Sequence, residues 1–163
     1  MKFLRRPAVL SAAAACLLLA SAGCSAFTGA VEVAAPSPSG DAARACRALD
    51  GALPGSVDGL PGRETDPASR WTAAWGDPAV TLRCGVPKPE VLTPGSEQYN
   101  PTSESVEVDG VQWLPEDVGD GYRFTTLRRE AYVEVFVPHA HAPGPEVLVD
   151  LAEAVGRAVP RTS

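Results

Sequence analysis

The sequence predicts an α+β fold: a small antiparallel sheet of about five strands, in two hairpins, packed by an N-terminal and a C-terminal helix and closed by one disulfide. Three observations predict it. Apolar and polar residues alternate over several short segments, and an Asp-Gly pair separates two of them. Amphipathic helical patterns stand near both ends of the domain. Two cysteines fall on apolar faces. We expect a single globular domain over residues 41–160.

The two helices are predicted from apolar residues at helical spacing. Residues 41–53 form the first, and Pro54 and Gly55 end it. Residues 145–159 form the second, where Pro145 suits the first turn. The apolar face of the first helix consists of Ala42, Ala45, Cys46 and Leu49.

Alternation predicts the strands. The first covers residues 79–84, where Val80, Leu82 and Cys84 share one face. A hairpin follows at residues 106–113, with Asp109 and Gly110 at its turn. The proline-rich residues 85–101 between them are predicted to form a loop.

A second hairpin is predicted from residues 122–127 and 131–137. Its last strand has two faces, because side chains alternate along a strand. The core face carries Val133, Val135 and Val137, whereas the outward face carries Tyr132, Glu134 and Phe136. The outward face is therefore open to a partner unless the proline-rich loop covers it.

Cys46 and Cys84 are predicted to form the disulfide. One lies on the apolar face of the helix and the other on the apolar face of the strand, so both sulfurs point into the same core. Two unpaired buried thiols are the alternative, and a metal site is less favoured because no further ligands stand nearby. An even pair of cysteines suits an oxidising compartment.

The N-terminus has the pattern of an export signal. Lys2, Arg5 and Arg6 precede an apolar run that is shorter than the ~20 residues needed to span a bilayer. Residues 21–24, Ser-Ala-Gly-Cys, resemble the bacterial lipoprotein box, although that box usually has Leu where Ser21 stands. The resemblance implies that residues 1–23 are a signal peptide. A peptidase would cut before Cys24, whose thiol would carry a diacylglyceryl group.

This lipid, with palmitate-type acyl chains, would hold the mature protein on the outer face of the cytoplasmic membrane. Two acyl chains suffice for stable attachment, whereas one chain gives only marginal binding. Residues 24–40, which are rich in Pro, Ser, Gly and Ala, are predicted to be the lipidated cysteine and a flexible tether.

Composition argues against several classes of function. The formal net charge of the chain is −6. Removal of the predicted signal peptide would also remove three basic residues and make the mature chain more acidic. The protein therefore lacks the basic character of a nucleic-acid-binding protein. No phosphate loop or dinucleotide fingerprint is present, and we expect no cofactor. His139 and His141 are the only two histidines, and they make neither a complete metal site nor a recognisable catalytic set. We expect both to be exposed loop residues.

Four stretches resemble an actinobacterial family of secreted or membrane-anchored proteins, the domain-of-unknown-function family 3515. They are residues 75–78 (Trp-Gly-Asp-Pro), 82–89, 111–114 and 129–138. The resemblance covers roughly residues 41–160 and implies an extracytoplasmic setting. The family has no established activity, so no catalytic residue is carried over.

The sequence therefore predicts a non-enzymatic accessory or binding lipoprotein that contacts another cell-envelope protein. The candidate interaction face consists of Tyr132, Phe136, Arg128 and Arg129. The two arginines have two further interpretations: pairing with acids near the hairpin, or receipt of an anionic ligand. The alternative function is a carboxylate-dependent envelope hydrolase, because 20 acidic residues offer many pairings. Trp75 is expected to pack on the core rather than stack on a ligand.

Overall fold

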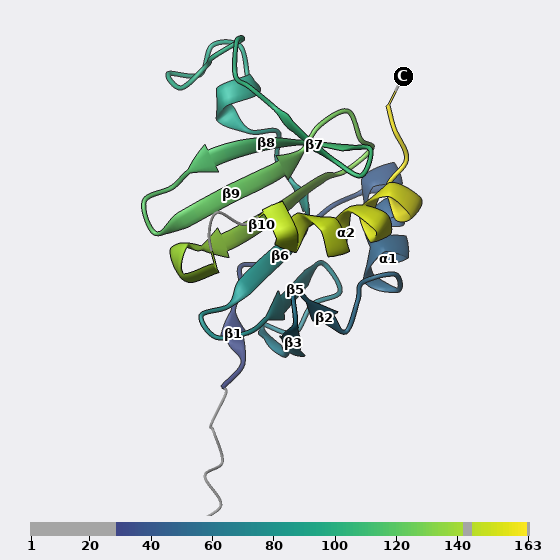
Figure 1. Cartoon of the computed structure of the whole chain (residues 1–163). Coiled ribbons are helices and arrows are strands. Elements are labelled where there is room, and N and C mark those ends of the chain that lie inside the picture. Colours follow the sequence, from purple (N-terminus) through teal and green to yellow (C-terminus); the bar gives the residue numbers. More distant parts are fainter. Residues whose placement is uncertain (1–28, 142–144, 163) are drawn as a thin grey trace, which may run out of the picture.

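The computed structural model describes residues 29–141 and 145–162. An antiparallel eight-stranded sheet, ordered β2-β3-β5-β6-β10-β9-β8-β7, packs against α1 (Gly40–Asp50) and α2 (Pro145–Ala158). Figure 1 shows α2 passing across the sheet with α1 beside it. From one edge to the other, the strands are β2 (Ser56–Val57), β3 (Leu60–Arg63), β5 (Thr72–Trp75), β6 (Val80–Val86), β10 (Tyr132–Pro138), β9 (Gly121–Thr126), β8 (Val111–Asp117) and β7 (Val106–Val108).

The predicted class is confirmed, but about five strands is too few. β2, β3 and β5 were not predicted, and all three precede β6. β3 contains Pro61 and Gly62, which are rare inside strands. β5 has buried residues on both of its faces, so its sequence does not alternate between apolar and polar.

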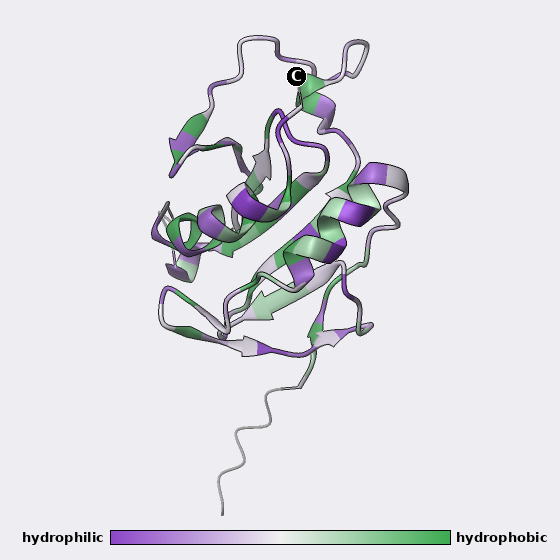
Figure 2. Ribbon diagram, turned by 90° about the vertical axis from the view of Figure 1, so that its right-hand side faces the viewer, coloured by the Kyte–Doolittle hydropathy of each residue, from purple (hydrophilic) through white to green (hydrophobic). Residues whose placement is uncertain are grey.

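Both helices bury their apolar stripes in one core cluster with the sheet. Figure 2 shows that the helical ribbons carry alternating hydrophobic and hydrophilic residues, as expected for helices with one buried face. α1 ends three residues earlier than predicted, where the Gly51 N–H donates to the Arg47 carbonyl. On α2, Arg157 and Glu153 form an exposed ion pair at 3.0 Å.

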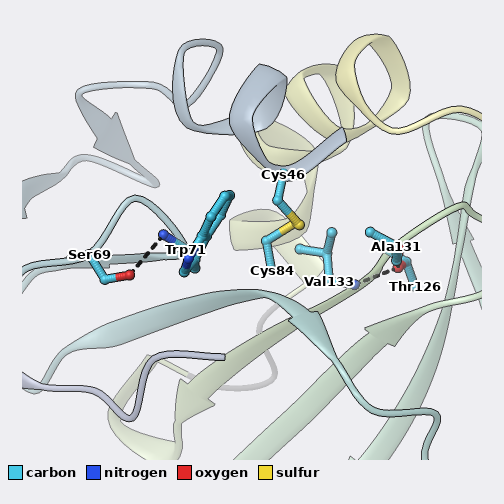
Figure 3. The surroundings of a disulfide bond; sticks show 7 residues. All are labelled: Cys46, Ser69, Trp71, Cys84, Thr126, Ala131 and Val133. Carbon is cyan, nitrogen blue, oxygen red and sulfur yellow. Dashed lines mark hydrogen bonds between the residues drawn. A yellow bond between two sulfur atoms is a disulfide. The ribbon is translucent and has the colours of Figure 1, made fainter. Parts of the chain in front are cut away.

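The predicted disulfide is confirmed. Cys46 of α1 and Cys84 of β6 are bonded, with their Cα atoms 5.6 Å apart. Both residues are buried. Figure 3 shows the bond between helix and sheet, with Trp71 and Val133 on either side of it. The disulfide thus fixes α1 onto the centre of the sheet.

The two predicted hairpins are confirmed, and they determine which face of the sheet is buried. β7 pairs with β8, and β9 pairs with β10, both antiparallel. Along β10, the three valines are fully buried, whereas Tyr132, Glu134 and Phe136 are half-buried on the other side. We call the side of the sheet away from α1 and α2 the open face.

The N-terminal segment is packed rather than flexible from residue 29 onward. β1 (Val31–Glu32) pairs in parallel with β4 (Thr65–Asp66), and Val33 is buried. The Ala34 carbonyl accepts a hydrogen bond of 2.9 Å from Nε of Arg83. The predicted tether over residues 24–40 is thus corrected for residues 29–40, because pairing with β4 satisfies backbone groups that composition alone left unassigned. Residues 24–28 lie outside the described residues.

Gly85 allows this segment to approach the sheet closely. A Cβ built on Gly85 would lie 2.5 Å from Cβ of Pro38, and the backbone of Gly85 has a φ of +88°. Both features favour glycine, which lacks a Cβ and tolerates positive φ. Residues 29–40 therefore pack against the folded domain, and α1 begins at Gly40, one residue before the predicted domain start at residue 41.

Candidate functional site

Four charged side chains cross the open face on four adjacent strands. We call this set the charged strip: Arg83 of β6, Glu134 of β10, Arg123 of β9 and Glu116 of β8. The strand register brings them together, since Glu134 lies opposite Arg83 and Glu116 lies opposite Arg123. Facing residues on neighbouring strands point to the same side of a sheet.

Ion pairs join the strip from end to end. Nη1 of Arg83 lies 3.1 Å from Glu134, which also faces Nε of Arg123 at 3.8 Å. Arg123 reaches Glu116 at 4.0 Å. The last two distances exceed a hydrogen bond, so Arg123 retains N–H donors for another acceptor. The side chain of Arg123 is 40% exposed, which makes it the most accessible member of the strip.

The strip forms part of the wall of a cavity of about 340 Å³. The proline-rich segment after β6 lines the other side, and Figure 1 shows this segment looping above the sheet before β7. It contributes Pro87, Lys88, Pro89, Glu90 and Gln98 to the lining. The predicted loop thus borders the open face without covering the strip.

Glu116 and Glu134 are the two carboxylates that come closest to the hydrolase alternative, since both line this cavity. A glycosidase needs one carboxylic acid that donates a proton and a second carboxylate that acts as base or nucleophile. Here both carboxylates face the same guanidinium group, that of Arg123. Both carboxylates are thus engaged in ion pairs across the strip. The arrangement suits ionic recognition better than acid–base chemistry.

The predicted aromatic residues do lie on the open face, but they do not form one patch. Phe136 lies opposite Arg123 in the register, whereas Tyr132 stands at the other end of β10, beyond Glu134. Phe136 also lines a second cavity of about 590 Å³ beside β1. Phe136 is therefore the aromatic residue that stands opposite Arg123 of the charged strip.

The predicted arginine pair lies elsewhere. Arg129 is only 7% exposed, and its Nη1 donates to the Val159 carbonyl at 2.7 Å, at the C-terminal end of α2. Burial lowers the pKa of Arg129 below its ordinary value, and the charge of Arg161 adds to this. Arg128 is exposed next to it. The two arginines stay together but share no cavity with the charged strip, and Arg129 is buried rather than the exposed contact that was predicted.

Both histidines have local partners. His139 and His141 lie in a short 3₁₀ helix, η2 (His139–His141). The His139 ring meets Tyr122 edge-on at 5.3 Å, and Nε2 of His141 lies 2.8 Å from the Pro78 carbonyl. Within residues 29–141 and 145–162, no group of three or more potential metal ligands comes together.

Trp75 packs in the core, as predicted. It is 2% exposed, and its indole N–H donates to the Pro54 carbonyl at 3.1 Å. A buried ring cannot stack on an external ligand, so its role is structural.

The charged strip, in contrast, was not predicted. Its members alternate outward on their own strands, but only the strand order places those strands side by side.

The part of the chain that the structure describes has no helix both long enough and apolar enough to cross a bilayer. A family model described as "Protein of unknown function (DUF3515)" matches residues 8–163. No curated protein matches the chain, and no solved structure does.

Proposed function

Since the chain belongs to DUF3515, a family of proteins of unknown function, we propose from its own residues that it is a non-enzymatic, lipid-anchored binding module on the outer face of the cytoplasmic membrane. The observation that carries this proposal is the lipoprotein-like box ending at Cys24, followed by a domain with a buried disulfide. Disulfides persist mainly in oxidising compartments, so Cys46–Cys84 supports export of the domain.

The packed N-terminal segment supports a short distance between anchor and domain. Gly29, the first described residue, is five positions beyond Cys24. Five residues span at most roughly 18 Å when fully extended. Figure 1 shows β1 at one end of the molecule and the C-terminus at the opposite end. With Cys24 lipidated, the β1 end would face the membrane and the C-terminal end would face away from it.

The open face is the proposed contact surface for another envelope protein. Arg123 carries N–H donors that its distant carboxylate partners leave available, and Phe136 lies opposite it on the neighbouring strand. A cation beside an aromatic ring matches a partner segment that presents an acidic residue next to an apolar one. Such a segment of the partner would bind in the cavity between the charged strip and the proline-rich residues.

Replacing Tyr132 and Phe136 together by alanine should abolish cross-linking of the membrane-bound protein to its partner while the domain stays folded. The partner would be captured by chemical cross-linking in the native membrane, and folding would be followed by thermal unfolding of the purified full chain. Val149→Ala is the control, because Val149 is 48% exposed on α2, away from the open face. This control should retain the cross-link.

A second variant, Arg123→Gln, keeps the test informative if the double variant unfolds. It removes the charge from a partly exposed side chain and leaves the aromatic rings in place. We expect it to weaken the same cross-link. Unchanged capture by Arg123→Gln and by a folded double variant would exclude the open face as the contact surface.

A further inference from the structure

A third cavity, of about 250 Å³, lies at the end of the domain away from β1. Two chain segments meet there: the Glu130 N–H donates to the Pro160 carbonyl, and the Thr162 N–H donates to the Arg128 carbonyl, both at 3.0 Å. The turn between β7 and β8, which includes Gly110, closes the third side. The lining residues are Glu107, Gly110, Gln112, Leu127, Arg128, Arg129, Arg161 and Thr162.

Three arginines line this small cavity: Arg128, Arg129 and Arg161. None of them has a carboxylate within 4.0 Å among residues 29–141 and 145–162. Among the described residues that line the cavity, Glu107 is the acidic one. The cavity is thus locally cationic in a protein whose formal net charge is −6.

Backbone carbonyls hold two of the guanidinium groups in place. Arg129 donates to the Val159 carbonyl at 2.7 Å and to the Gly110 carbonyl at 3.3 Å. Arg161 donates to the same Gly110 carbonyl at 2.7 Å. Burial is the main cause of the lowered pKa of Arg129, and repulsion from the Arg161 guanidinium on the same carbonyl oxygen lowers it further. An anion in the cavity would relieve this repulsion.

Donors remain for such an anion. A guanidinium group has five N–H donors, and Arg161 uses one of them in the hydrogen bonds described above. Arg128 has a backbone φ of +54°, a conformation that side-chain-bearing residues seldom adopt. Arg128 and Arg129 are consecutive in the chain, and both line the cavity.

We propose that this cavity binds a small oxyanion, a carboxylate or a phosphate, through Arg128 and Arg161, with buried Arg129 as a fixed positive charge behind them. Planar guanidinium groups match the paired oxygens of both anions. The volume lies below the usual range of pockets for drug-sized ligands, so it suits one anionic group of a larger ligand or a small free anion. The inference does not depend on lipid anchoring or on the open face.

The test is titration of the full chain, purified in a non-ionic detergent, with inorganic phosphate, dimethyl phosphate and acetate at constant ionic strength. Amide NMR signals of Gly110 and Gln112 report on the cavity. We expect saturable shifts of these signals. The tightest binder identifies the source: acetate indicates a carboxylate such as a peptide terminus, dimethyl phosphate a phosphodiester, and inorganic phosphate a free phosphate or monoester.

The double variant Arg128→Gln/Arg161→Gln should bind the tightest of these anions at least about tenfold more weakly, because charge-assisted hydrogen bonds are lost. Arg44→Gln/Arg157→Gln loses the same charge from exposed helix positions outside the cavity and should bind like the wild type. The absence of saturable shifts in the wild type would overturn the proposal. Equal weakening by both double variants would also overturn it, because it would indicate a nonspecific effect of net charge.

Discussion

Replacement of both Cys46 and Cys84 by alanine is expected to lower the free energy of unfolding by about 4 kcal/mol. The cross-link closes a loop with a sequence separation of 38 residues, and its loss releases that loop in the unfolded chain. Alanine leaves little empty volume in place of a thiol, so loop entropy dominates the effect. Figure 3 shows the bond joining α1 to the sheet.

Thermal unfolding of the full chain measures this effect. We expect the double variant to melt about 10–20 °C below the wild type. Reduction of the wild type before heating should reproduce the shift, which controls for packing changes at the alanines. A loss below about 1 kcal/mol would show that helix–sheet packing holds α1 without the disulfide.

Arg129→Met should lower the free energy of unfolding by about 1–3 kcal/mol. Methionine keeps an apolar stem but cannot donate hydrogen bonds, so the Val159 carbonyl at the end of α2 loses its buried donor. Leaving a buried acceptor unsatisfied is the main cost, and relief of the desolvated charge offsets part of it. The α2 terminus and the turn at Gly110 should loosen together, because Arg129 joins them.

Arg161→Met is the matched control for this prediction. Arg161 also donates to the Gly110 carbonyl, but it is exposed, so its loss should change stability by less than about 0.5 kcal/mol. Urea denaturation of both variants at equal protein concentration gives the comparison. Equal, small effects would mean that Arg129 does not stabilise the end of α2.

The sequence predicted those elements whose local pattern matches their environment. β10 alternates because the helices cover one of its faces and its other face is half open. The disulfide could be predicted because Cys46 and Cys84 lie on the apolar faces of a helix and a strand that were each identified from their own pattern. The turn of the β7–β8 hairpin followed from Asp109 and Gly110, which both adopt positive φ there.

What the sequence did not predict depends on contacts between distant segments. Residues 29–40 resemble a tether in composition, yet β4 and Gly85 bind them to the sheet. The charged strip requires β10 to lie between β6 and β9, and no local pattern specifies that order. Arginine is rarely buried, so the sequence placed Arg129 among the contact residues. Its burial depends on the backbone carbonyl of Val159 at the end of α2, which accepts its hydrogen bond.

The identity of the mature N-terminus tests the central proposal most directly. We expect the intact mass of protein extracted from host membranes to correspond to a chain that starts at Cys24 and carries a diacylglyceryl group. Cys24→Ala should accumulate as an uncut precursor without lipid, since the modified thiol is what the predicted peptidase requires. A mature wild-type protein that starts at Ser25 or Ala26 without lipid would contradict the account, because it would be a secreted protein without an anchor.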